Sequence, residues 1–271
     1  MTTPRSGPPD PADLVDLQRY PLLDLDGPAG RALVDRSRAA MAADGACELP
    51  GFLTADGLEA CVDDAVALAP AAHRSHGATT PYLEQPSPDW AEDHPRAQRL
   101  PFSLGAVAYD QFPASSPIRA VYEWEPLLRF VAAVLDRGEV FRYADPLGAL
   151  NLAVMDDGDV LGWHFDQTDF VVSLALRSAD AGGLFEVVPA TRTADDERYE
   201  VVGSVLDGVH PHDVLPNTPG TLLVFAGRRS LHRVSPIEGS TSRLIALFGF
   251  DDRPDTRSSA ELQRSRYGRT A

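Results

Sequence analysis

Residues 220–236 read GTLLVFAGRRSLHRVSP, and residues 243–250 read RLIALFGF. Each stretch contains a short apolar run bounded by glycine, serine or proline, which is typical of a β-strand between turns. Four similar runs precede them between residues 149 and 188: ALNLAVM, VLGWHF, FVVSLAL and GGLFEVV. Six such runs close together predict an antiparallel sandwich or barrel.

The first 140 residues have a different pattern, with apolar side chains at helical spacing. Helices are predicted over residues 31–43, where Gly45 can end the first, and over residues 55–68, where Thr54 can cap the second. A third helix is predicted from Ser116 to about Arg137, and Pro126 should kink or split it. The expected fold class is therefore α+β with a mainly β core and the N-terminal helices packed outside it.

The expected domain organisation follows from these changes of pattern. We expect an irregular or disordered N-terminal tail (1–28), a single domain (29–252) with a helical part (29–140) and a β core (141–252), and a polar, frayed C-terminal tail (253–271). Within the helical part, residues 70–115 are rich in proline, serine and charge and are too long for a plain connector. They are predicted to form a lid or binding loop, or to carry short elements that the pattern does not reveal.

Composition excludes several classes of function. The net charge of the 271 residues is −16, which argues against nucleic acid or an anionic membrane as a partner. No run approaches the length of a membrane helix, and the N-terminus lacks the apolar segment of a signal peptide, so a cytoplasmic protein is expected. All 24 basic residues are arginine, which excludes mechanisms that need a lysine Schiff base. Cys47 and Cys61 are expected to be ordinary reduced thiols.

The segment Gly162–Asp166, GWHFD, carries the first two candidate metal ligands. Side chains alternate in a strand, so His164 and Asp166 point the same way and can reach one ion. His232, near the end of the first quoted stretch, is the candidate third ligand. Two histidines and one carboxylate on one face of an octahedral ion form the facial triad of iron(II) oxygenases. An isolated H-x-D pair also occurs by chance as two polar residues on a wet strand face.

Arg243 lies eleven residues beyond His232, at the start of an apolar run. It shares a strand face with Ile245 and Leu247, so its guanidinium should be buried. A buried cation needs an anionic partner, and a guanidinium can bind a carboxylate through two parallel hydrogen bonds. A dicarboxylic cosubstrate would supply that partner.

Taken in order, these motifs resemble the 2-oxoglutarate/iron(II) dioxygenases with a double-stranded β-helix (jelly-roll, cupin-like) core, over about residues 145–250. The matching elements are H-x-D, the Gly182-Gly183 strand, G-x-L-x-x-F-x-G before the distal histidine, and the following arginine. The resemblance implies that His164, Asp166 and His232 bind Fe(II), and that Arg243 binds the distal carboxylate of 2-oxoglutarate. It also implies O2 as cosubstrate, with ascorbate as a candidate activator.

A finer resemblance concerns residues 93–96 (DHPR), YADPLGALN and GWHFD, which look like the branch acting on free amino acids, including lysine hydroxylases and lysine halogenases. The halogenases of that branch replace the metal carboxylate with glycine to admit halide, whereas this chain keeps Asp166, which disfavours halogenation. Leu247 and Gly249 stand where polar substrate contacts would be expected. The departure puts free lysine in doubt and suggests a modified or less polar substrate.

Several other residues are candidates with ordinary structural alternatives. Asn151, on a predicted core strand, would bind 2-oxoglutarate or substrate, and a structural asparagine is equally expected. Arg96 is the first candidate for a substrate-carboxylate clamp, with Arg177 a weaker one. Asp145 would pair with a substrate amine, although solvated acids are the default interpretation. The remaining polar candidates, Glu123, His94, His210 and His212, are interpreted as solvated or loop residues.

The expected function is therefore hydroxylation of an unactivated C–H bond in a small molecule, a free or nonproteinogenic amino acid of specialised metabolism. The same site would also serve oxidative ring closure or desaturation. A cupin-like metalloenzyme without 2-oxoglutarate and a non-catalytic jelly-roll binding module are the competing hypotheses. The sequence does not indicate an oligomeric state.

Overall fold

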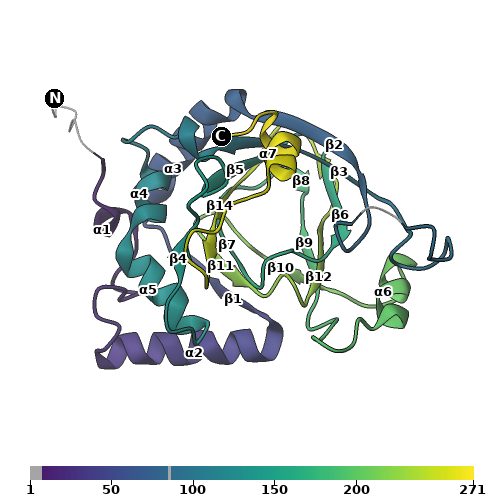
Figure 1. Ribbon diagram of the computed structural model, residues 1–271. Helices are drawn as coiled ribbons and strands as arrows, with labels where there is room; N and C mark the ends of the chain where they lie inside the picture. Colours follow the sequence, from purple (N-terminus) through teal and green to yellow (C-terminus); the bar gives the residue numbers. More distant parts are fainter. Residues whose placement is uncertain (1–7, 85–86) are drawn as a thin grey trace.

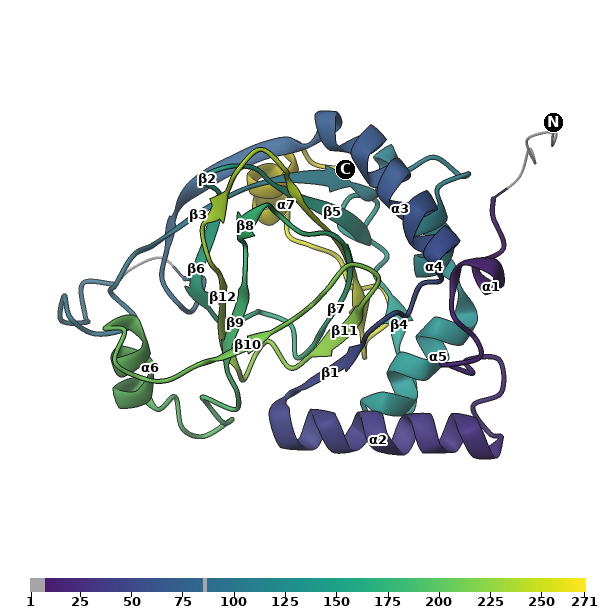
Figure 2. The same ribbon diagram turned by 180° about the vertical axis from the view of Figure 1, so that it is seen from behind.

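The computed structural model describes residues 8–84 and 87–271 of the chain. One large antiparallel sheet curves around a central space, and most helices lie outside it on one side (Figures 1 and 2). Its strand order is β1-β11-β7-β14-β5-β3-β6-β12-β9-β10, with β2 paired to β3. The predicted jelly-roll core with external helices is confirmed.

Eleven strands form this sheet, and two small two-stranded sheets accompany it. The main-sheet strands are β1 (Ala46–Leu49), β2 (His73–Thr79), β3 (Leu100–Ala108), β5 (Leu150–Met155), β6 (Val160–His164), β7 (Val171–Arg177), β9 (Phe185–Val188), β10 (Asp213–Leu215), β11 (Leu222–Phe225), β12 (Leu231–Val234) and β14 (Arg243–Phe248). The small sheets pair β4 (Phe141–Arg142) with β15 (Phe250–Asp251), and β8 (Ala181–Gly182) with β13 (Ile237–Glu238).

The helices match the sequence pattern closely in the N-terminal half. They are α1 (Pro11–Leu14), α2 (Pro28–Asp44), α3 (Ala55–Leu68), α4 (Pro117–Glu123), α5 (Glu125–Val134), α6 (Tyr199–Leu206) and α7 (Ala260–Tyr267), with 3-10 turns η1 (Ala69–Ala71) and η2 (Tyr109–Gln111). Gly45 ends α2 in the left-handed conformation, and the Thr54 side chain caps α3 by accepting from the Gly57 amide. The third predicted helix is split at Trp124, with Pro126 in the first turn of α5.

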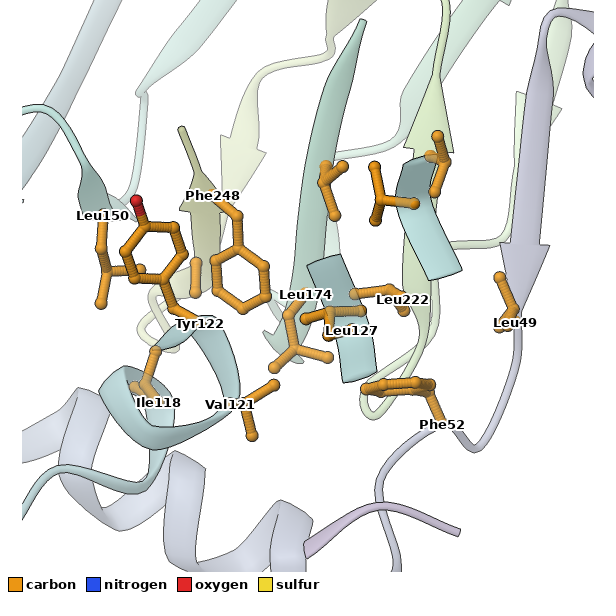
Figure 3. Packing of buried hydrophobic residues seen from close by; sticks show 14 of the residues in the cluster. Leu49, Phe52, Ile118, Val121, Tyr122, Leu127, Leu150, Leu174, Leu222 and Phe248 are labelled. Atoms are coloured by element: carbon orange, nitrogen blue, oxygen red, sulfur yellow. The ribbon is translucent and has the colours of Figure 1, made fainter. Parts of the chain in front are cut away.

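The outer face of the sheet forms the main hydrophobic core. Alternate residues of the central strands point outward, and Figure 3 shows Leu150, Leu174 and Phe248 against Tyr122 and Leu127 of α4 and α5. All five side chains are less than 5% exposed. This packing holds the helices on one side of the sheet and leaves the other face to line the interior.

The inner face carries the polar candidates. Asn151 on β5 lies directly opposite Leu247 on β14, and Met155 lies opposite Arg243. Residues directly opposite in an antiparallel pair share a face, so Asn151 and Arg243 both lie on the face that the core helices do not cover. The alternation that buries Leu150, Leu152 and Val154 outside therefore places the polar set inside.

Residues 70–115 carry elements that the sequence pattern does not reveal, which is the second of the two alternatives for this segment. Residues 73–79 and 100–108 pair as strands β2 and β3 of the main sheet. Strand β2 bonds only to β3 and is largely exposed, so its sequence, HRSHGAT, lacks an apolar face that would have revealed it. Only the connection between the two strands, of which residues 80–84 and 87–99 are described, remains as a loop.

Both tails are more ordered than expected. The first seven residues of the predicted disordered tail lie outside the described residues, but Val15 pairs with Leu53 and Leu22 is fully buried. At the other end, the expected frayed tail contains α7, whose Gln263 and Tyr267 are buried. None of the helices in the described residues combines the length and hydropathy that crossing a bilayer requires.

Candidate metal centre

The sheet itself brings the two candidate histidines together. His164 ends β6, and His232 lies directly opposite it on β12, so the two side chains share a face. Their ring centroids lie 4.2 Å apart. Asp166 lies two residues beyond the end of β6, and its backbone amide donates to the carbonyl oxygen of Gly227 at 3.0 Å. Two segments that lie far apart in the sequence are thus joined at the site.

The three predicted ligands converge to the spacing that one ion requires. One ligand atom from each of His164, Asp166 and His232 lies within 4.8 Å of the other two. The Nε2 atoms of His164 and His232 are 3.9 Å and 3.4 Å from the Asp166 carboxylate oxygens. Within residues 8–84 and 87–271, this is the single group of three or more histidine, cysteine or acidic side chains with such spacing.

Backbone hydrogen bonds fix both imidazole rings for metal binding. His164 Nδ1 donates to the Gly162 carbonyl at 2.8 Å, and His232 Nδ1 donates to the Ser230 carbonyl at 2.9 Å. Because a carbonyl oxygen can only accept, each Nδ1 carries a proton, and in the neutral ring the Nε2 atom then keeps its lone pair. Both lone pairs lie on the Asp166 side, which gives the N2O donor set that suits Fe(II).

The electrostatic environment keeps His164 neutral. Burial and the neighbouring His232 lower the pKa of His164 to about 4, although the Asp166 carboxylate opposes the shift. A neutral imidazole is the form that binds a metal, so the site is ready for a cation at neutral pH. The acidic side chain of this site is Asp166.

Gly227 provides the space for the Asp166 carboxylate. A Cβ added at Gly227 would lie 1.8 Å from Asp166 Oδ2. No side chain fits there without moving the carboxylate. The last glycine of the G-x-L-x-x-F-x-G motif is therefore required by the carboxylate that packs against it.

Arg243 is buried without an acidic partner. It is 8% exposed, and its one hydrogen-bond contact is Met155 Sδ at 3.8 Å. Burial lowers the pKa of Arg243 to about 10. No carboxylate of the described chain lies within ion-pair distance of this guanidinium. A buried cation of this kind fits the carboxylate of a ligand.

A cavity of about 270 Å³ adjoins Arg243. Arg177 and Asn217 also line it, and the Asn217 Oδ1 atom is buried without a hydrogen-bond partner. Asp180 lies there as well, but its carboxylate accepts from the backbone amides of Ser240 and Thr241. Two arginines therefore line the cavity, and the one carboxylate that lines it already accepts hydrogen bonds from backbone amides.

Comparison with known proteins identifies the family. The sequence profile of HalD, Halogenase D, matches residues 100–267, which is more than half of the chain and includes every residue of the centre.

The chain belongs to the HalD family.

No curated protein matches this HalD-family chain significantly. Solved structures share its fold at low identity. An oxidoreductase of the 2OG-Fe(II) oxygenase family from Burkholderia pseudomallei has 17% identity and a TM-score of 0.51, covering 81% of this chain and 91% of that chain. The epimerase SnoN from nogalamycin biosynthesis has 14% identity and a TM-score of 0.58, covering 82% of each chain. The carbocyclase SnoK from nogalamycin biosynthesis has 13% identity and a TM-score of 0.54, covering 91% of this chain and 87% of that chain. The fold of the HalD-family protein is therefore that of 2OG-Fe(II) oxygenases.

Asn151 of the HalD-family protein is buried on the inner face of the sheet. It is 6% exposed on the inner face, opposite Leu247, and its side-chain amide makes no hydrogen bond to any described residue. Arg177 lines the Arg243 cavity, and its Nε donates to the Ser242 carbonyl at 2.9 Å. The structure thus brings Arg177 to the predicted cosubstrate end, whereas Asn151 lies farther along the same face.

The other predicted substrate contacts are engaged with the protein. Arg96 pairs with Glu84 at 2.5 Å and Glu197 at 3.2 Å, and its guanidinium lies over the Tyr82 ring. It therefore has two carboxylates already, which does not favour its predicted role as a clamp. Asp145 accepts from the amides of Leu147 and Ser258 and from the side chain of Gln263, which anchors α7.

The remaining polar and aromatic residues near these motifs lie away from the metal centre. Trp163 is 7% exposed and packs in a core cluster. Glu123 accepts from Arg119. His94 stacks on Trp90 in the loop after β2, and His212 lies 3.4 Å from Glu186. None of these groups reaches the metal centre.

Sequence analysis missed the residues that support the ligands. The sequence marks Phe165 only as the middle of H-x-D, and Gly227 only as part of a motif. Arg192 belongs to no motif, although its guanidinium carbon lies 4.2 Å from the Phe165 ring centroid. Its position in the irregular stretch TRTADDER gave no periodic signal, because its partners come from distant segments.

Proposed function

We propose that this HalD-family protein is an Fe(II)- and 2-oxoglutarate-dependent oxygenase that hydroxylates an unactivated C–H bond of a small molecule. One observation carries the proposal. Two imidazoles and a carboxylate converge within 4.8 Å, and the same inner face holds a buried guanidinium without an acidic partner. A divalent cation satisfies the first group, and a dicarboxylate chelating that cation satisfies the second.

The residues have distinct parts in this proposal. His164, Asp166 and His232 hold the iron through Nε2, carboxylate and Nε2 atoms, while Arg243 binds the far carboxylate of 2-oxoglutarate. Iron and 2-oxoglutarate, when bound, supply the oxidising chemistry with O2. The chain fixes the ligands through backbone carbonyls and places the substrate carbon beside the metal. A bound SnoN structure contains Fe3+, alpha ketoglutarate and nogalamycin RO, which is consistent with this use of the fold.

Hydroxylation is favoured over halogenation because Asp166 is present. Its carboxylate lies within 4 Å of both imidazole Nε2 atoms, where it fills the third protein position. No protein ligand is missing, so no vacated ligand position is available to a halide. The family description, Halogenase D, therefore does not specify the reaction of this chain.

The proposed substrate is a free or nonproteinogenic amino acid, lysine-like or modified. The motif resemblance supports an amino acid, and the inner face supports a less polar one. Leu247 lies opposite Asn151 on that face, and a Cβ at Gly249 would lie 2.8 Å from the Ala149 carbonyl, so neither offers a polar group. Asn151 remains as an unpaired amide that can orient the substrate or 2-oxoglutarate.

Ring closure is the second candidate outcome, and the likeness to SnoK, a carbocyclase, favours it. Desaturation belongs with it, since all three outcomes begin with hydrogen abstraction at a positioned carbon. The triad is common to all of them, so product analysis distinguishes them. A product heavier by one oxygen supports hydroxylation, whereas loss of two hydrogens supports closure or desaturation.

Anaerobic titration tests the site directly. Fe(II) and 2-oxoglutarate added together should give the weak visible charge-transfer band of a chelated iron, and each alone should not. Arg243→Ala should weaken the 2-oxoglutarate dependence of the band, and Asp166→Ala should abolish the coupled formation of product and succinate. Arg233→Ala, which alters an arginine beside His232, is the matched control.

The competing hypotheses predict other results. Metal binding with no band, and no change in Arg243→Ala, would indicate a cupin-type enzyme that does not use 2-oxoglutarate. Absence of any metal binding would indicate a binding module. For the substrate, cell extract incubated with enzyme, Fe(II), 2-oxoglutarate and ascorbate should show one metabolite consumed in untargeted mass spectrometry.

A further inference from the structure

The metal-binding turn of this protein is held by a second set of side chains, which we call the cap. The cap consists of residues 80–84 and 87–99, after β2, together with residues 192–206, which include α6. Phe165, between the ligands His164 and Asp166, is 1% exposed, and its amide donates to the Pro81 carbonyl at 2.7 Å. Its ring lies 5.3 Å from that of Tyr82. The cap therefore contacts the H-x-D turn through its middle residue.

Arg192 connects this turn to the loop that leads to His232. Its guanidinium carbon lies 4.2 Å from the Phe165 ring centroid. Its Nε donates to the Arg228 carbonyl at 2.7 Å, and its backbone amide donates to the Arg229 carbonyl at 3.1 Å. One residue thus holds both segments that carry metal ligands.

The loop contact reaches Asp166 as well. Arg228 follows Gly227, whose carbonyl accepts from the Asp166 amide and whose missing side chain makes room for the Asp166 carboxylate. A shift of residues 227–229 would therefore move the backbone that packs against the Asp166 carboxylate. It would also move the start of the segment that leads to His232. Geometric control of ligands by such outer contacts is a general property of metal sites.

Glu197 connects Arg192 to the part of the cap that follows β2. One carboxylate oxygen binds Arg192 at 3.0 Å, and the other binds Arg96 at 3.2 Å. The Arg96 guanidinium lies 4.2 Å from the Tyr82 ring, which itself packs on Phe165. The contacts close a ring from Phe165 through Arg192, Glu197, Arg96 and Tyr82 back to Phe165.

We propose that Arg192 is a positioning residue that fixes the relative placement of the three metal ligands, and that Glu197 couples Arg192 to the rest of the cap. The role requires a guanidinium, because only a planar group can lie on the Phe165 ring while donating in its own plane to a carbonyl and a carboxylate. A lysine ammonium cannot make these contacts together. The inference rests on the proposed function for the identity of the metal, whereas the ligand geometry can be tested without turnover.

The experiment compares Arg192→Lys with Arg233→Lys. Arg233 is the matched control because its guanidinium lies 4.9 Å from Trp163, the other neighbour of His164, and pairs with Glu186, yet no bond of its side chain reaches residues 227–229. Co(II) serves as the probe, since its visible spectrum reports ligand geometry, and a competing chelator gives its Kd. Spectra are taken well below the Tm of each variant.

Arg192→Lys should weaken Co(II) binding about 10–100-fold and alter the visible spectrum, as loss of outer contacts at metal sites does. Arg233→Lys should leave both unchanged. Glu197→Gln should shift the spectrum in the same direction by a smaller amount. Wild-type Co(II) affinity and spectrum in Arg192→Lys, with or without a lower Tm, would overturn the positioning role. An unchanged spectrum in Glu197→Gln would overturn the coupling to the cap.

Failure of the proposed function gives a different result. If the wild-type protein binds no Co(II), the metal centre itself is wrong and this inference falls with it. If the wild type binds Co(II) and then 2-oxoglutarate but Arg192→Lys behaves identically, only the inference falls.

Discussion

Two regions of the molecule bury arginine in opposite ways. In the cap, Arg96 and Arg192 both contact Glu197, and Arg96 contacts Glu84 as well, so the positive charges are balanced within the protein. At the cavity beside β14, Arg243 is more deeply buried and its one polar contact is a sulfur atom. A balanced arginine is explained by the architecture of the chain, whereas an unbalanced one is explained by a ligand.

Arg243→Met should produce the largest effect and should separate binding from stability. Loss of one partner of a buried charge pair costs about 2–5 kcal/mol, so 2-oxoglutarate binding should weaken roughly 30-fold or more. The ligand-free variant should unfold at a higher temperature than the wild type, because an unpaired buried cation is replaced by an unbranched apolar side chain. Isothermal titration in the presence of Fe(II) under anaerobic conditions and thermal unfolding measure the two changes. A lower Tm without ligand would contradict the assignment of Arg243 as unbalanced.

The same comparison applies to the carboxylates. Asp145 accepts from the Ser258 amide and the Gln263 side chain among other protein donors, whereas Asp166 faces two imidazoles and no arginine of the described chain. Asp166 is therefore the carboxylate that we expect to bind a cation.

Gly227→Ala sharpens this distinction without changing any ligand. The new Cβ would lie 1.8 Å from Asp166 Oδ2, so the carboxylate must move. Metal affinity should fall about 10–100-fold, the range observed when support of a ligand is lost. Chelator competition with Co(II) gives the change in Kd. Gly138→Ala is the control, because a Cβ there meets no atom within 4 Å. Equal Co(II) affinity of Gly227→Ala and the wild type would show that the carboxylate does not bind the metal.

Arg96→Met tests an arginine whose charge is balanced by carboxylates of the protein. It leaves Glu84 and Glu197 without one partner, but both are partly exposed, so the free energy of unfolding should fall by only about 1–2 kcal/mol. The affinity for 2-oxoglutarate should not change, in contrast to Arg243→Met. Denaturant unfolding and the anaerobic titration measure both. A substrate KM that rises far more than stability falls would restore Arg96 as the predicted substrate clamp.

The sequence predicted the parts of the site that depend on local periodicity. The alternation of H-x-D placed His164 and Asp166 on one side, and the alternation of RLIALFGF placed Arg243 on the inner face of β14. The order of the motifs then identified His232. Its pairing with His164 was not readable, because strand register between distant segments depends on the whole sheet.

The parts that local pattern does not reveal depend on partners far away in the chain. Arg96 is predicted to clamp a substrate carboxylate, but Glu197, 101 residues away, pairs with its guanidinium, and the substrate contact stays a prediction. Strand β2 has no apolar face because it lies at an exposed edge and bonds only to β3. Helix α7 has a polar sequence, and it is ordered through Asp145, a residue 118 positions before Gln263. No local pattern carries this information.

Asp145→Asn gives the smallest expected effect and a distinct pH dependence. Burial alone would raise the pKa of Asp145, but hydrogen bonds from the Leu147, Gly148 and Ser258 amides outweigh it and lower the pKa below the ordinary value. A carboxylate with a lowered pKa stabilises the fold above its unfolded pKa of about 3.9, and this contribution is lost as the pH falls through the folded value.

Asp145→Asn should therefore reduce the free energy of unfolding by about 1 kcal/mol at pH 7, and the difference from the wild type should shrink below pH 4. Hydrogen exchange should show the loss first in α7, because Gln263 and Ser258 are its anchors to the sheet. Gln263→Ala should reproduce the α7 exchange at pH 7 without the pH dependence. Asp145→Asn could instead leave α7 protected from exchange and raise only the substrate KM. That result would show that Asp145 binds the substrate amine and that its hydrogen bonds within the protein do not anchor α7.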